Sequence, residues 1–79
     1  MHFENITVQA YSGYKLNERP LSFVWRGTMY RVVDIVDRWY EGSTGSVCLD
    51  YFKVSADNGQ CYILRYNSLF DAWAIVVPD

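Results

Sequence analysis

Apolar and polar side chains alternate along most of this chain, and no stretch sustains the roughly 3.6-residue period of a helix. Residues 5–11, for example, carry Ile6, Val8 and Ala10 at every second position. Because successive side chains of a β-strand point to opposite faces of a sheet, this pattern predicts strands with one buried face. We expect further strands between turn residues at 21–26, 29–40, 47–56, 61–67 and 72–77.

The clearest hairpin joins residues 21–26 to residues 29–40. Gly27 is the first residue of a two-residue loop, where glycine favours a type II′ turn. That turn places Trp25 opposite Tyr30, so that both rings share one face. The other expected pairs are Arg26 with Met29, Val24 with Arg31 and Phe23 with Val32.

The alternation breaks after Val32. The next strong apolar residues, Ile35 and Trp39, have odd numbers, whereas Val32 has an even one. One extra residue near positions 33–34 would restore the pattern, so we expect a β-bulge or a strong bend there. Trp39 is then expected in the core of the bent strand. The alternative is an interface anchor formed by Trp39, Tyr40 and the preceding Arg38.

The second hairpin joins residues 47–56 to residues 61–67. A two-residue turn at Asn58-Gly59 would put the apolar residues of the two strands on different faces. A three-residue loop with Gly59 in the left-handed region instead pairs Val54 with Tyr62, and we favour it because it buries one whole strand face. The other expected pairs are Ala56 with Gln60, Phe52 with Leu64, Lys53 with Ile63 and Tyr51 with Arg65.

These strands predict an all-β fold, either a strongly bent antiparallel sheet or a small half-open barrel of five to six strands built from hairpins. The 79 residues suffice for one domain, with residues 1–18 as an N-terminal strand and loop and residues 19–77 as the core region. Loops are expected at residues 12–19 and 41–46. Aromatic residues make up 18% of the chain, and we expect most of these rings in the core.

Residue types that carry chemistry are sparse. The chain has one histidine, His2, and two widely spaced cysteines, Cys48 and Cys61, so we expect no catalytic residue, metal site or cofactor. The remaining enzyme hypothesis is a carboxylate pair, Asp34 and Asp37, and we favour a protein that is not an enzyme. No signal peptide or membrane span is evident, which predicts a cytoplasmic protein with reduced thiols.

The candidate binding residues lie on the outward strand positions. The expected registers put Arg26, Arg31, Lys53 and Arg65 there together with Tyr51. Such a face is either merely solvated, or binds a protein, another copy of the chain included, or binds single-stranded nucleic acid by stacking and charge. The formal net charge of −2 argues against binding a nucleic-acid backbone, so we favour a protein partner. The candidate anchors Arg38, Trp39 and Tyr40 complete the predicted site.

Residues 19–32 read R-P-L-S-F-V-W-R-G-T-M-Y-R-V. With Trp39, Tyr62–Leu64 and Trp73, they resemble a family of small bacterial proteins of unknown function that carry an R-P-x-x-F-x-W-x-G-x-x-Y-x-V segment, a later tryptophan and a Y-x-L…W ending. The resemblance covers residues 19–77. Members are often encoded beside accessory genes of error-prone DNA polymerases, which implies a link to DNA repair and no catalytic residue. Thr28 and Met29 are neutral where the family leads us to expect basic residues, and this departure weakens a nucleic-acid function.

Overall fold

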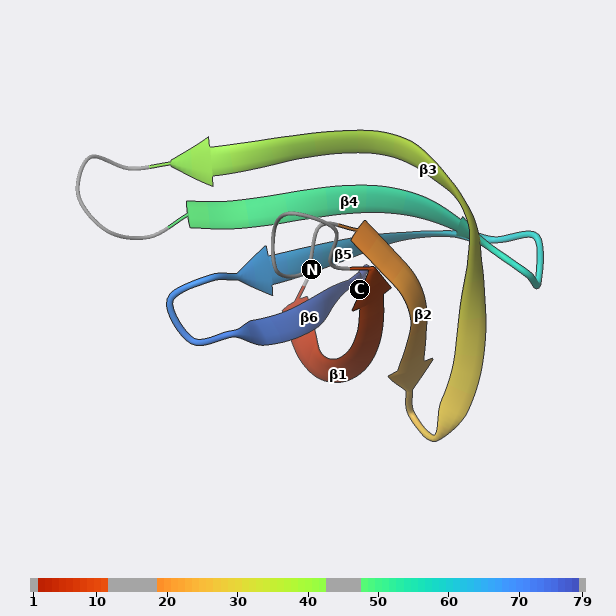
Figure 1. Cartoon of the computed structure of the whole chain (residues 1–79). Coiled ribbons are helices and arrows are strands. Elements are labelled where there is room, and N and C mark those ends of the chain that lie inside the picture. The colour runs from red at the N-terminus through yellow and green to blue at the C-terminus, as the bar shows by residue number, and fades with distance from the viewer. Residues whose placement is uncertain (1, 12–18, 43–47, 79) are drawn as a thin grey trace.

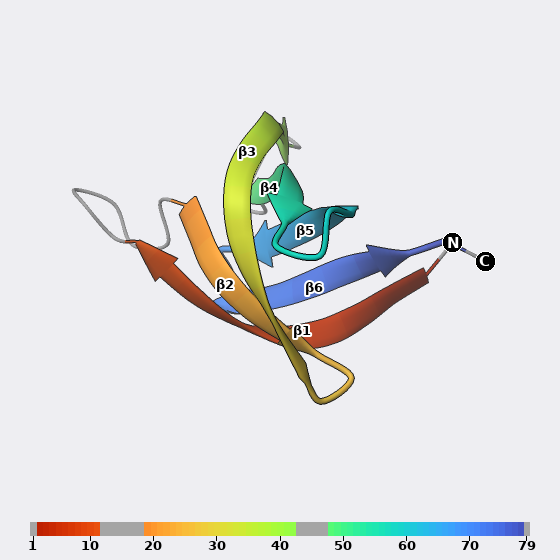
Figure 2. The same cartoon turned by 90° about the vertical axis from the view of Figure 1, so that its right-hand side faces the viewer.

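The fold is an antiparallel β-barrel, described by a computed structural model at residues 2–11, 19–42 and 48–78 (Figures 1 and 2). The all-β prediction is confirmed, and the barrel is closed where a half-open one was expected. Each strand pairs with its neighbours in sequence, and the first strand closes onto the last. The strands are β1 (His2–Tyr11), β2 (Arg19–Trp25), β3 (Thr28–Gly42), β4 (Cys48–Ala56), β5 (Cys61–Asn67) and β6 (Ala72–Val77).

The barrel closes because β1 changes partner half-way along its length. From His2 to Ile6 it pairs with β6, and from Thr7 to Tyr11 it pairs with β2. The strand therefore begins before the expected residue 5, and its first residues make the closing ladder. Closure pairs most of the sheet edges that would otherwise favour aggregation.

The turn between β2 and β3 differs from the expected one. Its central residues are Arg26 and Gly27, with φ angles of 51° and 77°, where Gly27-Thr28 was expected. Positive φ at both positions is the signature of a type I′ turn, which matches the twist of the flanking strands. The predicted pairing of Trp25 with Tyr30 is therefore wrong. The observed pairs are Trp25 with Thr28, Val24 with Met29, Phe23 with Tyr30 and Ser22 with Arg31.

This correction leaves the faces of the hairpin unchanged. Moving the loop by one residue shifts each residue's partner by two positions along the opposite strand. Because side chains on one face recur every second residue, the new partner lies on the same face as the expected one. Phe23 is buried and stacks on Tyr30, with ring centroids 5.1 Å apart. Phe23 and Trp25 therefore face the core as the alternation predicts, although their register differs, whereas Leu21 of the same alternation is 38% exposed.

The expected irregularity in β3 is confirmed, and a second one follows it. The pairing with β4 shifts between Val32 and Asp34 and again between Ile35 and Asp37. Val33 and Val36 are the extra residues, and bulges of this kind bend a strand, as the strongly curved β3 in Figure 1 shows. Because the second bulge reverses the facing of all later residues, Trp39 does not enter the core.

The hairpin between β4 and β5 confirms the three-residue loop. Val54 pairs with Tyr62, and the Ala56 backbone N–H donates to the Gln60 carbonyl at 2.9 Å. Gly59 has a φ of 82°, a conformation that costs glycine little and other residues more. All four of the remaining predicted pairs, including Lys53 with Ile63 and Tyr51 with Arg65, follow the observed register.

The core is a layer of inward side chains from neighbouring strands. Phe52, Leu64 and Ile75 lie side by side on β4, β5 and β6, and each is fully buried. Trp73 packs against Phe52 with ring centroids 5.6 Å apart. Aromatic rings fill much of this interior, which lets a short chain bury a large apolar area.

Two expected loops are partly strand. Arg19 already belongs to β2, and Glu41 and Gly42 end β3. The rest of these predicted loops, at residues 12–18 and 43–46, lies outside the described residues. In the part of the chain that the structure describes, no helix has the length and apolarity needed to cross a bilayer.

Candidate protein-binding surface

The side chains that alternate with the core layer form a surface on the outside of the barrel. Tyr51 and Arg65 are adjacent to Phe52 and Leu64 along their strands, so they point outward. Trp39 pairs with Tyr51 on one side, and Arg65 pairs with Ala74 on the other. We call the group Phe3, Trp39, Tyr51 and Arg65 the outer aromatic face.

The rings of Trp39 and Tyr51 are stacked. Their centroids are 5.4 Å apart and their planes differ by 1°. The register explains this contact, since directly opposed side chains on antiparallel strands have Cβ atoms about 5 Å apart. Trp39 is 37% exposed, so the stack presents part of an indole ring to solvent instead of filling the core as expected. The reason is the bulge at Val36.

Arg65 links this stack to β1. Its guanidinium lies 3.8 Å from the ring centroid of Phe3, which is 41% exposed. Because β6 lies between β5 and β1, the Arg65 side chain crosses over Ala74, whose small size leaves room for it. Ala74 is only 5% exposed for this reason. The arginine stem thus covers the sheet while its cation stays at the surface.

Tyr51 also takes part in a polar network. Its hydroxyl lies near the Glu41 carboxylate and the Arg65 guanidinium. Burial raises the pKa of the Tyr51 hydroxyl, the Glu41 carboxylate adds to the rise, and Arg65 opposes it.

Four of the eight predicted site residues come together here. Trp39, Tyr51 and Arg65 are in contact as described, and Lys53 lies next along β4 on the same side of the sheet. Asp37 pairs directly with Lys53, so this face is less purely basic than the sequence suggested.

Arg26 lies elsewhere, because it occupies a turn and not a strand. Its Nη2 donates to the Glu4 carboxylate at 2.6 Å and its Nε at 3.0 Å. Its guanidinium also lies 4.8 Å from the centroid of Trp25, whose indole N–H donates to Glu4 at 2.8 Å. Arg26 lowers the pKa of Glu4, and the Glu4 carboxylate raises the pKa of Arg26. The pair ties the turn to β1.

The other predicted residues are also separate from the outer aromatic face. Arg31 pairs with Ser22 and lies beside Gln9, on the part of the barrel formed by β1, β2 and β3. Arg38 lies on the same side of the sheet as its partner Phe52, with its guanidinium 4.8 Å from the Phe52 ring centroid, and its side chain is exposed. Tyr40 shares the Arg38 side of β3 and is 73% exposed.

The structure does not join the two carboxylates of the enzyme hypothesis in one hollow. Asp34 lines a hollow of about 200 Å³ between β2 and β3, with neighbours that do not include Asp37. The Asp37 carboxylate instead accepts a hydrogen bond from the Arg38 backbone N–H at 2.8 Å. Cys61 is exposed with a free thiol. The described residues contain no group of three or more His, Cys, Asp or Glu side chains that could hold a metal ion.

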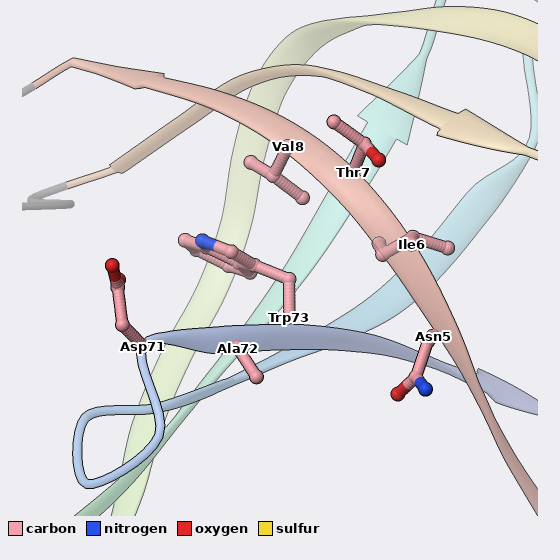
Figure 3. Close-up of a pocket in the computed structure, with 7 residues that line it drawn as sticks. All are labelled: Asn5, Ile6, Thr7, Val8, Asp71, Ala72 and Trp73. Carbon is pink, nitrogen blue, oxygen red and sulfur yellow. The ribbon is translucent and has the colours of Figure 1, made fainter.

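Hollows occur where neighbouring strands separate. Figure 3 shows one of about 490 Å³ between β1 and β6, with the Trp73 ring directed toward Val8. It forms where β1 leaves β6 to pair with β2. At its edge, Asp71 accepts a hydrogen bond from the Tyr66 hydroxyl at 2.8 Å, so this carboxylate helps to fix the turn.

The sequence did not identify Phe3 and Glu41 as site residues. Phe3 could have been found by extending the alternation of Ile6 and Val8 back to His2, which puts odd-numbered residues outward. Its contact with Arg65 depends on the closing ladder between β1 and β6, and no sequence signal specified that pairing. Glu41 was expected in a loop, and only the length of β3 brings it beside Tyr51.

Comparison of the chain with protein-family models, with curated proteins and with solved structures finds no match. The resemblance of residues 19–77 to a family of small bacterial proteins therefore stays a prediction.

Proposed function

We propose that this chain is a non-enzymatic module that binds a protein partner through the outer aromatic face. The observation that carries the proposal is the stacked pair Trp39 and Tyr51 beside Arg65 and the exposed Phe3. Tryptophan, tyrosine and arginine are the residues that most often dominate the binding energy of protein interfaces. Here they form one continuous surface across β3, β4, β5 and β1.

The contacts within this face favour tight binding. Trp39 is held by its stack on Tyr51, and Arg65 is held by its contact with the Phe3 ring. Ordering a free side chain at an interface costs roughly 0.5–1.5 kcal/mol. A partner that binds side chains already in place avoids much of that cost.

The proposal is tested by capturing partners from a cell extract with tagged wild-type protein and three variants. Trp39→Ala and Arg65→Glu change the outer aromatic face. Arg31→Glu makes the same charge change elsewhere on the barrel and serves as the matched control. We expect the first two variants to lose the partner and the control to keep it. Purified partner should then bind the two variants at least about tenfold more weakly, a loss of about 1.4 kcal/mol.

Two results would overturn this assignment. One is capture that is equal for the wild type and for both face variants while all proteins remain folded. The other is loss of capture in the Arg31→Glu control alone. If the partner is a second copy of the chain, sedimentation will show self-association that the face variants remove and the control retains.

The second candidate function is binding of single-stranded nucleic acid, in which bases stack on exposed rings and cations meet phosphates. The stack of Trp39 and Tyr51 next to Arg65 supports it. The carboxylates of Glu41 and Asp37 beside this face oppose it, as does the net charge of −2. Titration with a labelled oligonucleotide at about 50 mM and about 200 mM salt distinguishes the two, because phosphate binding weakens steeply with salt.

A further inference from the structure

The ladder between β5 and β6 does not include the first residues of β5 or the last residues of β6. It runs from Asn67 paired with Ala72 to Leu64 paired with Ile75. The first residues of β5, Cys61 to Ile63, pair only with β4, and the last residues of β6, Val76 and Val77, pair only with β1. Figure 1 shows β5 extending beyond the end of β6 toward the β4–β5 turn. Among the described residues, no strand lies between these two segments.

A groove of about 540 Å³ opens at this separation. Most of its lining is apolar or aromatic, and none of the lining side chains carries a formal charge. Trp25 and Tyr62, whose ring centroids are 6.0 Å apart, contribute to its wall. The lining residues are Trp25, Gln60, Cys61, Tyr62, Ile63, Val76 and Pro78.

Backbone groups of both strands point into this groove. In an antiparallel ladder, the N–H and C=O of one residue point to the same neighbour, and this neighbour alternates along the strand. The Ala56 N–H donates to the Gln60 carbonyl, so the backbone N–H and C=O groups of Tyr62 and Leu64 also point toward β4. Cys61 and Ile63 therefore direct their N–H and C=O groups away from β4. The Ile63 C=O meets the Val76 N–H, because this bond flanks the last pair Leu64 and Ile75, whereas the Ile63 N–H and both Cys61 groups point into the groove beyond the end of the ladder.

The same argument applies to β6, where Pro78 limits how far the ladder could extend. The backbone N–H and C=O groups of Arg65 point toward β6, so those of its partner Ala74 point toward β5. The backbone groups of Val76, two residues on, also point toward β5. The next β6 position with this direction is Pro78, which has no N–H to donate. Continuing the register would place Pro78 opposite Cys61, where a ladder hydrogen bond is required. The groove is thus bounded by two strand edges that separate after Ile63 and Val76, and Pro78 prevents a ladder pair at Cys61.

We propose that this groove binds an extended acidic segment of a partner protein, which adds as a strand to the free edge of β5. Strand addition satisfies the Ile63 N–H and the backbone groups of Cys61, and it places alternate side chains of the segment on the apolar wall. The proposal rests on the assigned protein-binding function and specifies the conformation and charge of the partner segment.

Charge complementarity decides the acidic character of the segment. Its outward side chains would lie beside Arg65 and within two strand spacings, about 10 Å, of Lys53 across Ile63. That distance is comparable to the Debye length at physiological salt. Aspartate or glutamate at these positions is attracted to both cations, because Asp37 and Glu41 lie on β3, one strand further from the groove than Lys53, whereas lysine is repelled by the cations.

A synthetic peptide of about six residues that alternates valine with aspartate tests the proposal, since about six residues is a common strand length. The amide signals of Cys61, Ile63 and Val76 should shift in NMR spectra of the full chain. Amide exchange at Cys61 and Ile63 should slow at least about tenfold. A peptide with lysine for aspartate should bind at least about tenfold more weakly. A lack of shifts at these amides with about millimolar valine–aspartate peptide refutes the proposal.

Two matched variants separate the backbone contact from the side-chain contact. Ile63→Pro removes the N–H that points into the groove, and proline is tolerated where that N–H faces away from the ladder. Ile63→Ala shortens the side chain and keeps the N–H. We expect Ile63→Pro to weaken peptide binding at least about tenfold relative to Ile63→Ala. If Ile63→Pro fails to fold, a peptide N-methylated at its alternate residues makes the same test on the wild-type chain.

The outcomes distinguish this inference from the proposed function. If partner capture depends on Trp39 and Arg65, and neither Ile63→Pro nor the N-methylated peptide changes binding, the outer aromatic face is an interface but strand addition is wrong. If the acidic peptide binds the groove and capture ignores Trp39 and Arg65, strand addition is right and the proposed surface is wrong.

Discussion

Replacement of Leu64 by alanine should destabilise the protein severely, because this side chain lies at the centre of the closed barrel. Leu64 is fully buried, and so are its cross-strand neighbours Phe52 and Ile75. The ladders on both sides limit how far the surroundings can collapse into the cavity. We therefore expect a loss of about 3–5 kcal/mol, the upper part of the range for leucine to alanine.

This loss is large for so small a domain. At about 0.05–0.15 kcal/mol per residue, 79 residues give about 4–12 kcal/mol of total stability. The melting temperature should fall by about 12–40 °C, and urea unfolding followed by tryptophan fluorescence should give the same free energy. Leu69→Ala is the matched control, since Leu69 is 56% exposed and should cost within about 0.5 kcal/mol. A Leu64→Ala cost no larger than that of the control would show that the barrel is not closed around this residue.

Three further predictions concern local contacts. In a double-mutant cycle, alanine at Trp39 and Tyr51 should reveal a coupling of about 0.5–1.5 kcal/mol, and a coupling near zero would contradict the stack. The hydrogen bonds of Glu4, first of all those with Arg26, lower its pKa below the usual value of 4.5. Its stabilising effect is therefore complete above about pH 4.5 and is lost as the pH falls below that value. Urea midpoints at about pH 7 and about pH 3 should therefore differ more for wild type than for Glu4→Gln, and equal differences would exclude this role. Gly59→Ala should destabilise the protein by about 1–2 kcal/mol from its positive φ alone, because the added Cβ meets open space. Gly42→Ala is the control and should be nearly neutral in thermal unfolding. Equal costs for the two variants would contradict the left-handed turn.

Side-chain alternation was sufficient to predict the second hairpin and the inward facing of Phe23 and Trp25 in the first. The apolar positions of β4 and β5 select the three-residue loop over a two-residue Asn58-Gly59 turn, since any odd slip would expose a whole face. In the first hairpin, two registers bury the same face, so alternation could not choose between them. The observed one requires Arg26 at positive φ, an unfavourable conformation for arginine. Its ion pair with Glu4, 22 residues away in sequence, helps to hold it there.

The candidate site was less predictable because it depends on long-range pairing. The bulge at Val36 leaves no distinct pattern in the sequence, yet it turns Trp39 outward and puts Arg38 on the Phe52 side of the sheet. The contact of Arg65 with Phe3 requires β1 and β6 to close the barrel. Local propensities specify strands and turns, whereas closure and bulges are decided by packing of the whole sheet.

The account depends most on Trp39 being the tryptophan that meets a partner. Fluorine-labelled tryptophan gives separate NMR signals for Trp25, Trp39 and Trp73, and the partner recovered by capture can be titrated against them. Trp73 is only 7% exposed and should not change. We predict that the Trp39 signal shifts and saturates with the partner. A Trp39 signal that stays unchanged when the partner is fully bound would contradict the account.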